Sequence, residues 1–130
     1  MKSKVQENLN SAQILINNQH FTASIHCSYY AVLEYMKYML ANTDRNPISF
    51  EVQESNSGDS SHEYILGEII GRIDHGKKAK KNFSQGVRFL KKERVDADYT
   101  QRKFSDIDAL DCKQKAEGLI TNLKTYFGNI

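Results

Sequence analysis

The chain has 130 residues, of which 39% are hydrophobic and 26% are charged, with a formal net charge of +2. This length is typical of one domain with a core of ordinary size, and the composition excludes a disordered chain. No apolar run approaches the about 18 residues of a membrane span. The first residues, MKSKVQENLN, also lack the apolar stretch of a signal peptide. We therefore expect a single cytoplasmic domain over residues 1–130, without a membrane partner.

Apolar residues recur at helical spacing along nearly the whole chain. They predict a first helix over about residues 3–18 and a second over about residues 21–41. The second helix is apolar on most of its circumference, which is typical of a central helix that touches several neighbours or a second subunit. Its tyrosines are expected mostly in the core, with some at an interface, since a buried hydroxyl needs a partner. They are Tyr29, Tyr30, Tyr35 and Tyr38.

Residues 42–60 break this pattern, because they are rich in Asn, Ser, Asp and Gly and contain the single proline, Pro47. We expect a long, mobile loop here. A shorter helix follows, up to about Ile73. Within it, Gly67 and Gly71 lie one turn apart, and they either permit close helix contact or merely soften the helix.

The fourth helix is expected from Lys77 through the stretch RVDADY, which is residues 94–99. The fifth begins after Ser105, a favourable N-cap residue that is followed by acidic residues in the first turn, and it ends at Gly128. The sequence therefore predicts an all-α fold, an antiparallel bundle of four long helices and one short helix.

The charge is distributed unevenly along this chain. Residues 77–103 contain ten lysines and arginines against three acids, whereas residues 43–76 contain two against seven. This polarity suggests an anionic partner for one face, although a charge run alone more often marks a solvated helix face. On the fourth helix, at about 100° per residue, the candidate ligand-binding cations gather opposite the apolar stripe. They are Lys77, Lys81, Arg88 and Lys92.

Arg94 follows Leu90 by four residues and precedes Ala97 by three, so it continues the inward, apolar stripe. An inward arginine is costly unless its charge is paired and its donors are satisfied. Asp98, one turn on, is the expected partner, whereas Asp96 projects elsewhere. Arg94 is then either a structural ion pair, which geometry alone slightly favours, or part of a cleft, often one shared with a second subunit, that binds an anion.

Cys27 and Cys112 lie far apart and lack the spacing of a zinc site or a redox pair. Both fall on apolar helix faces, so we expect buried free thiols. The Glu-x-x-His pairs of di-iron bundles do not occur in the sequence. Neither a metal nor another cofactor is predicted.

Several stretches carry a family resemblance. They are SAQILINNQHFTASIHCSYYAVLEYMKYML, the loop that leads to Ser61 and His62, RVDADY, and a closing helix with alanines and an aromatic end. Together, over roughly residues 5–127, they resemble the HEPN family of small helical proteins, and RVDADY is similar to the Arg-x-x-Ala-Asp-Tyr of one bacterial branch. The resemblance implies a homodimeric helical bundle.

Many HEPN proteins are metal-independent ribonucleases and several are toxins, while others bind nucleotides or act as non-catalytic partners of small nucleotidyltransferases. The nuclease motif is Arg-x(4–6)-His. Arg94 matches its arginine, but residues 99–101 are Tyr, Thr and Gln, so the histidine is missing. Cleavage through the 2′-hydroxyl requires a group that exchanges a proton near neutral pH. Tyr99 has a reference pKa of about 10 and is a poor base.

His62 is a minor catalytic candidate that would approach from another helix, and no role is assigned to His20, His26 or His75. We therefore expect a binding module in which Arg94, Asp98, Tyr99 and the lysine stripe meet RNA, a nucleotide or an acidic partner protein, as in the HEPN half of a nucleotidyltransferase-paired system. The alternative is a metal-independent endoribonuclease that uses Arg94 with His62 or Tyr99.

Overall fold

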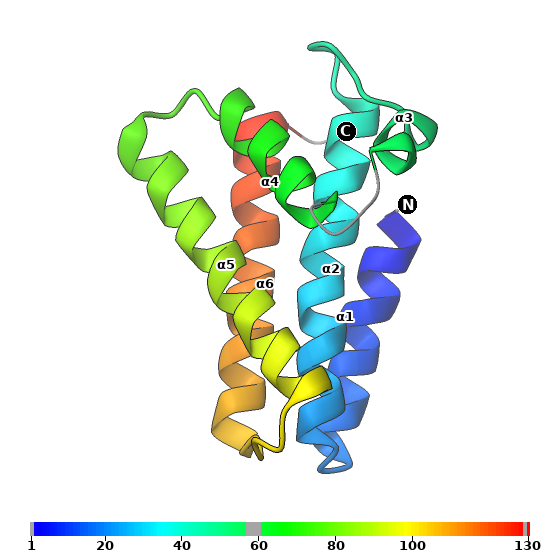
Figure 1. The fold of residues 1–130 in the computed structure, drawn as a ribbon, viewed down its shortest axis with the longest axis vertical. Coiled ribbons are helices and arrows are strands. Elements are labelled where there is room, and N and C mark those ends of the chain that lie inside the picture. Colours follow the sequence, from blue (N-terminus) through cyan, green and yellow to red (C-terminus); the bar gives the residue numbers. More distant parts are fainter. Residues whose placement is uncertain (1, 57–60, 129) are drawn as a thin grey trace.

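A computed structural model describes residues 2–56, 61–128 and 130. These residues form six helices and no strand (Figure 1), which confirms the all-α prediction. The helices are α1 Lys2–Asn17, α2 Phe21–Asn42, α3 Phe50–Ser55, α4 Ser61–Arg72, α5 Lys77–Tyr99 and α6 Asp106–Phe127.

Five of these helices lie within a residue or two of their predicted positions, and α3 is the exception. It lies inside residues 42–60, where a loop is predicted. The Ser49 side chain begins α3 by accepting a hydrogen bond from the Val52 amide. A helix of six residues is too short to produce a periodic apolar pattern, which explains why the sequence does not reveal it. Residues 57–60 of the predicted loop lie outside the described residues.

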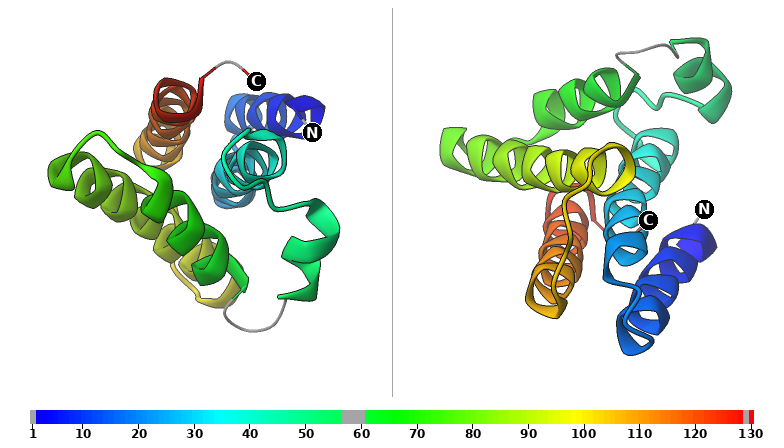
Figure 2. Two further views of the ribbon diagram at one scale, coloured as in Figure 1. Left: turned by 90° about the horizontal axis from the view of Figure 1, so that it is seen from above. Right: turned by 60° about the horizontal axis from the view of Figure 1, so that its bottom comes forward.

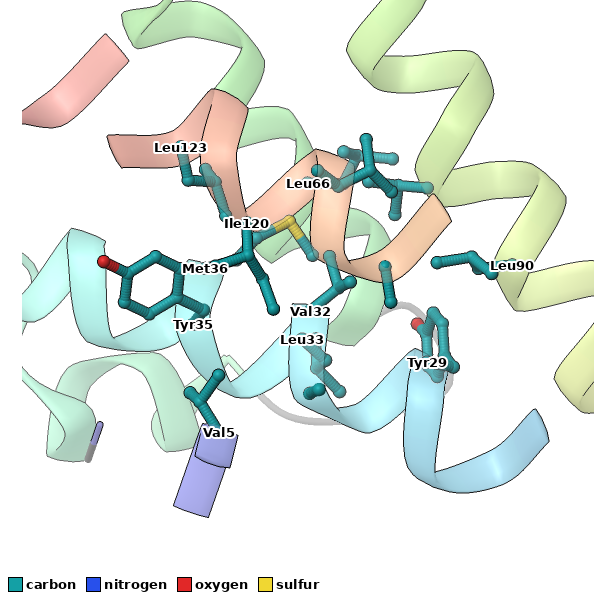
Figure 3. Packing of buried hydrophobic residues seen from close by; sticks show 14 of the residues in the cluster. Val5, Tyr29, Val32, Leu33, Tyr35, Met36, Leu66, Leu90, Ile120 and Leu123 are labelled. Carbon is teal, nitrogen blue, oxygen red and sulfur yellow. The ribbon is translucent and has the colours of Figure 1, made fainter. Parts of the chain in front are cut away.

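Helix α2 is the central element, as its composition predicts. It packs against α1, α3, α4, α5 and α6, and Figure 2 shows it surrounded by these helices. Its side chains, including Val32, Leu33 and Met36, contribute to a shared apolar cluster (Figure 3) in which these three residues are almost completely buried. The apolar circumference of α2 is therefore covered within one chain and does not itself require a second subunit.

Of the described glycines, only Gly86 has a neighbouring side chain near the position that a Cβ atom would take. A Cβ atom added at Gly86 of α5 would lie 2.9 Å from Cδ2 of Leu119 on α6. At Gly67 and Gly71, by contrast, an added Cβ would meet no described atom within 4 Å. Gly67 and Gly71 therefore do not mark a close contact between helices, which was one of their two interpretations.

The start of α6 has the predicted cap. The Ser105 hydroxyl accepts a hydrogen bond from the Asp108 amide, and the Asp108 carboxylate accepts one from the Ser105 amide. This capping box satisfies two of the amides that a helix start leaves without partners.

Both cysteines are free thiols, as predicted, but only one is fully buried. Cys112 is buried on α6, whereas Cys27 is only partly buried on α2. Burial raises the pKa of the Cys112 thiol to about 12 and also raises the pKa of Cys27. Among the described residues, no helix has both the length and the hydropathy that crossing a membrane requires.

Candidate functional site

The Arg94 side chain points inward, as the stripe on α5 predicts. It is only 10% exposed, and its Nη1 lies 3.5 Å from Oδ2 of Asp98, one turn further along the helix. Helix α5 runs obliquely across α2 in Figure 1 and packs against it, so the last turns of α5 lie over the first half of α2. This crossing positions the guanidinium against α2.

Two tyrosines of α2 form the surface on which Arg94 lies. The centre of its guanidinium is 5.3 Å from the ring centroid of Tyr29 and 5.7 Å from that of Tyr30. The two rings meet edge to face, with centroids 5.3 Å apart. Each such cation–π contact stabilises by about 0.5–2 kcal/mol, depending on how far water is excluded. The tyrosines therefore hold the cation in a partly apolar environment.

His62, from the first turn of α4, reaches the same place. Its Nδ1 lies 2.9 Å from the Tyr29 hydroxyl, and its ring meets the Tyr30 ring edge to face at 6.1 Å. Helix α4 packs against both α2 and α5, and this packing brings the imidazole close to Arg94. The sequence prediction that His62 approaches from another helix is consistent with this geometry.

His26 also contacts Tyr30. Its ring stacks on the Tyr30 ring at a centroid distance of 4.5 Å, and its Nδ1 lies 3.1 Å from Oδ2 of Asp98. The Asp98 carboxylate therefore contacts Arg94 and His26 through the same oxygen. We call this group of side chains the Arg94 cluster. Its members are His26, Tyr29 and Tyr30 of α2, His62 of α4, and Arg94 and Asp98 of α5.

The guanidinium of Arg94 has donors to spare. An arginine carries five N–H donors. Among the described residues, its one hydrogen bond is the long contact with Asp98, and its Nε is buried without a partner. A buried donor without a partner is unfavourable, and a guanidinium is well suited to hold an oxyanion. The cluster therefore has the chemistry of an anion site.

The protonation of the cluster follows from its burial. Burial raises the pKa of Tyr29 to about 12, against the opposing attraction of Arg94, so the hydroxyl stays protonated. Burial also lowers the pKa of His62 below its ordinary value of 6.5, and repulsion from Arg94 and Lys91 lowers it further. His62 is therefore neutral at neutral pH and can accept a proton.

The lowered pKa of His62 makes stability depend on pH. Below the ordinary value of 6.5, the unfolded chain binds a proton at this residue that the folded chain binds only at lower pH. We expect the free energy of unfolding to fall as the pH drops below 6.5, down to the folded-state pKa of His62. The variant His62→Gln should lack this component in urea unfolding at a series of pH values.

The control for this prediction is His20→Gln, since the exposed His20 side chain makes no capping hydrogen bond at the start of α2. It should keep the pH dependence of the wild type. Identical pH profiles for His62→Gln and the wild type would contradict the assignment.

The other residues proposed from the sequence lie outside the cluster. Tyr99 is 76% exposed and projects, by helical geometry, about 140° around α5 from Arg94. Asp96 pairs with Arg102 at 3.1 Å, so it projects away from Arg94, as predicted. The four stripe cations are exposed on α5, and one of them, Arg88, pairs with Glu63 of α4 at 3.1 Å. They are Lys77, Lys81, Arg88 and Lys92.

Sequence reasoning assigned no role to His26 and expected the tyrosines mostly in the core, which holds for Tyr29, while Tyr30 is partly buried. Part of the pattern is visible in the sequence, because His26 precedes Tyr29 by three residues and Tyr30 by four, which places all three on one side of a helix. The contact between His26 and Asp98 spans 72 residues and leaves no local pattern. Only the packing of α5 on α2 creates it.

The Arg94 cluster offers a cation and imidazoles rather than a set of metal ligands. Within residues 2–56, 61–128 and 130, no three His, Cys, Asp or Glu side chains gather closely enough to hold a metal ion. No family model, curated protein or solved structure significantly matches this chain.

Proposed function

We propose that the protein is a HEPN-like helical bundle that binds RNA through the Arg94 cluster. The observation that carries this proposal is a guanidinium that is 10% exposed, lies against Tyr29 and Tyr30, and holds one long hydrogen bond among the described residues. A phosphate would provide Arg94 with charge-assisted hydrogen bonds for donors that are otherwise unused. The resemblance of RVDADY to the HEPN motif supports the same residue as the centre of the site.

The charge of α5 supports RNA over a neutral ligand. The exposed cations Lys77, Lys81 and Lys92 lie on the helix that carries Arg94, but on its outward face, so an RNA that meets both must run around α5. Such a stripe neutralises successive phosphates and releases their counterions. The alternative ligands of the Arg94 cluster are a free nucleotide and an acidic partner protein, including a nucleotidyltransferase. Binding measurements distinguish them from RNA.

The proposal predicts RNA binding that depends strongly on salt. Labelled single-stranded RNA should be retained by the protein at low ionic strength, with an affinity that falls linearly on a logarithmic scale as salt increases. Filter binding at several salt concentrations measures this. A complete lack of retention at low salt would rule out the RNA function, and retention that is insensitive to salt would argue against phosphate contacts.

A second candidate function, metal-independent cleavage of RNA, is favoured by the two histidines. In one tautomer, Nδ1–H of His62 donates to the Tyr29 hydroxyl oxygen, and Nε2 is left free to accept the proton of a 2′-hydroxyl. His26 is oriented by Asp98 and, when protonated, can donate a proton to the leaving oxygen. These residues supply the proton exchange that the missing downstream histidine would otherwise provide.

We also propose a homodimer, on grounds other than the composition of α2. Two pairs of exposed apolar residues lie where α5 ends and α6 begins, and in each pair the helical spacing places both residues on one face. They are Val95 and Tyr99 of α5, and Ile107 and Leu110 of α6. Ile107 and Tyr99 are 74% and 76% exposed, so a second subunit that covered them would remove apolar surface from water.

Light scattering should therefore give twice the 14.9 kDa chain mass at micromolar concentration. The double variant Tyr99→Ser with Ile107→Ser should shift the protein toward the monomer. As a control, Ile14→Ser changes an exposed residue on α1 and should leave the mass unchanged. A monomeric wild type would contradict the proposal.

A further inference from the structure

A cavity of about 270 Å³ lies beside the Arg94 cluster, and His62 forms part of its wall. This volume is just below the range of about 300–1,000 Å³ that ligand pockets occupy. Its walls come from α1, α2, α3 and α4. The wall residues used below are Lys4, Lys37, Phe50, Gln53, His62 and Ile65.

Gln53 is a wall residue whose side-chain oxygen has no partner among the described residues. The residue is only 5% exposed, and its Nε2 donates to the backbone carbonyls of Lys37, at 3.0 Å, and Ile48, at 2.8 Å. These two bonds fix the orientation of the amide, and its Oε1 is buried with no partner among the described residues. A ligand that satisfies this oxygen must supply an N–H or O–H donor.

The rest of the wall combines apolar groups with two lysines and two carboxylates. Phe50 and Ile65 present an aromatic and an aliphatic surface that suit a flat ring. Lys4 and Lys37 supply positive charge, which Glu34 and Glu54 in the same wall offset, and Lys37 pairs with Glu34 at 3.8 Å. The wall also includes the first residues of α4, where backbone amides of the first turn have no partner within the helix and favour an anion.

From these features we infer that the cavity receives one nucleotide of a bound RNA. The base packs against Phe50 and Ile65 and donates an N–H to Oε1 of Gln53. The phosphate faces Lys37 and the start of α4. The inference rests on the proposed RNA-binding function, because the cavity shares His62 with the Arg94 cluster and the strand must pass from one to the other.

Titration with each of the four nucleoside 5′-monophosphates tests this pocket, with amide NMR shifts as the readout. At least one of them should shift the amides of Phe50–Ser55 and of the first turns of α4. Inorganic phosphate, used as a second probe, should bind more weakly because it cannot use Phe50 or Gln53. Phe50→Ala should weaken binding of the monophosphate by about tenfold, since it removes stacking from one base.

Val52→Ala is the matched control, because Val52 lies on the same helix, is 50% exposed and does not line the cavity. It should bind like the wild type. The proposed nucleotide site is contradicted if no monophosphate shifts these amides or if Phe50→Ala binds the monophosphate as tightly as the wild type. It is also contradicted if inorganic phosphate binds as tightly as the monophosphate.

Parallel filter binding with RNA distinguishes the two proposals. Salt-dependent RNA retention without binding of any monophosphate would overturn the pocket and leave the RNA function standing. If a monophosphate binds and Phe50→Ala weakens that binding, but RNA is not retained, the RNA function is overturned. The cavity would then be supported as a site for free nucleotides. If the protein binds neither RNA nor any monophosphate, both proposals are rejected.

Discussion

Replacing Arg94 with alanine is expected to lower the free energy of unfolding by about 3 kcal/mol, because it removes two cation–π contacts and leaves Asp98 without its cation. Arg94→Ala should also abolish RNA binding at physiological salt. Urea unfolding and filter binding measure the two effects separately, at a temperature at which the variant is still folded.

The matched control is Arg88→Ala on the same helix. Arg88 is 56% exposed and pairs with Glu63 at the surface, so its loss should cost no more than about 0.5 kcal/mol. If Arg94→Ala lowered the free energy of unfolding as little as Arg88→Ala, the description of Arg94 as buried and paired would be wrong.

Asp98→Asn separates a purely structural ion pair from an anion site. The substitution keeps the size of the side chain but removes the charge that competes with a phosphate for Arg94. An anion site predicts that RNA affinity rises by about fivefold, corresponding to about 1 kcal/mol of competing attraction. A purely structural role predicts lower stability with no gain in RNA affinity.

The histidines carry the second large expected effect. If the protein cleaves RNA in the presence of a chelator, His62→Ala and His26→Ala should each lower the rate by about 100-fold or more, because each removes one proton-transfer group. The readout is single-turnover cleavage of a labelled RNA at neutral pH. The two variants should still retain RNA in filter binding, since Arg94 is unchanged.

His75→Ala is the control for cleavage, because His75 contacts Tyr126 and Asp74 rather than the Arg94 cluster. It should cleave at the wild-type rate. Cleavage that persists equally in Arg94→Ala, His62→Ala and the wild type would identify a contaminating nuclease, and the protein would then be a binding module only.

The sequence predicts those parts of the fold that depend on local spacing. The apolar stripe of α5 places Arg94 inward and Asp98 beside it, because both statements depend only on helical geometry over four residues. The N-cap at Ser105 follows from neighbouring residues in the sequence, and the central position of α2 follows from its apolar composition. Both features could therefore be predicted from the sequence as well.

What the sequence does not reveal depends on how distant segments pack. The contacts of His26 with Asp98 and of His62 with Tyr29 join residues 72 and 33 positions apart. The close approach of α5 and α6 at Gly86 is equally invisible, whereas Gly67 and Gly71, which attract attention by their spacing, face open space. Pattern reasoning therefore finds the arginine of the site but not the aromatic and imidazole groups around it.

The central claim is that Arg94 holds a phosphate of RNA, and the salt dependence of binding tests it most directly. Affinities of the wild type and of Arg94→Gln for the same RNA should be measured across a series of salt concentrations. Loss of one phosphate contact should reduce the slope of log affinity against log salt by about 1, in addition to weakening binding. Parallel lines with equal slopes would show that Arg94 contacts no phosphate and would contradict the claim.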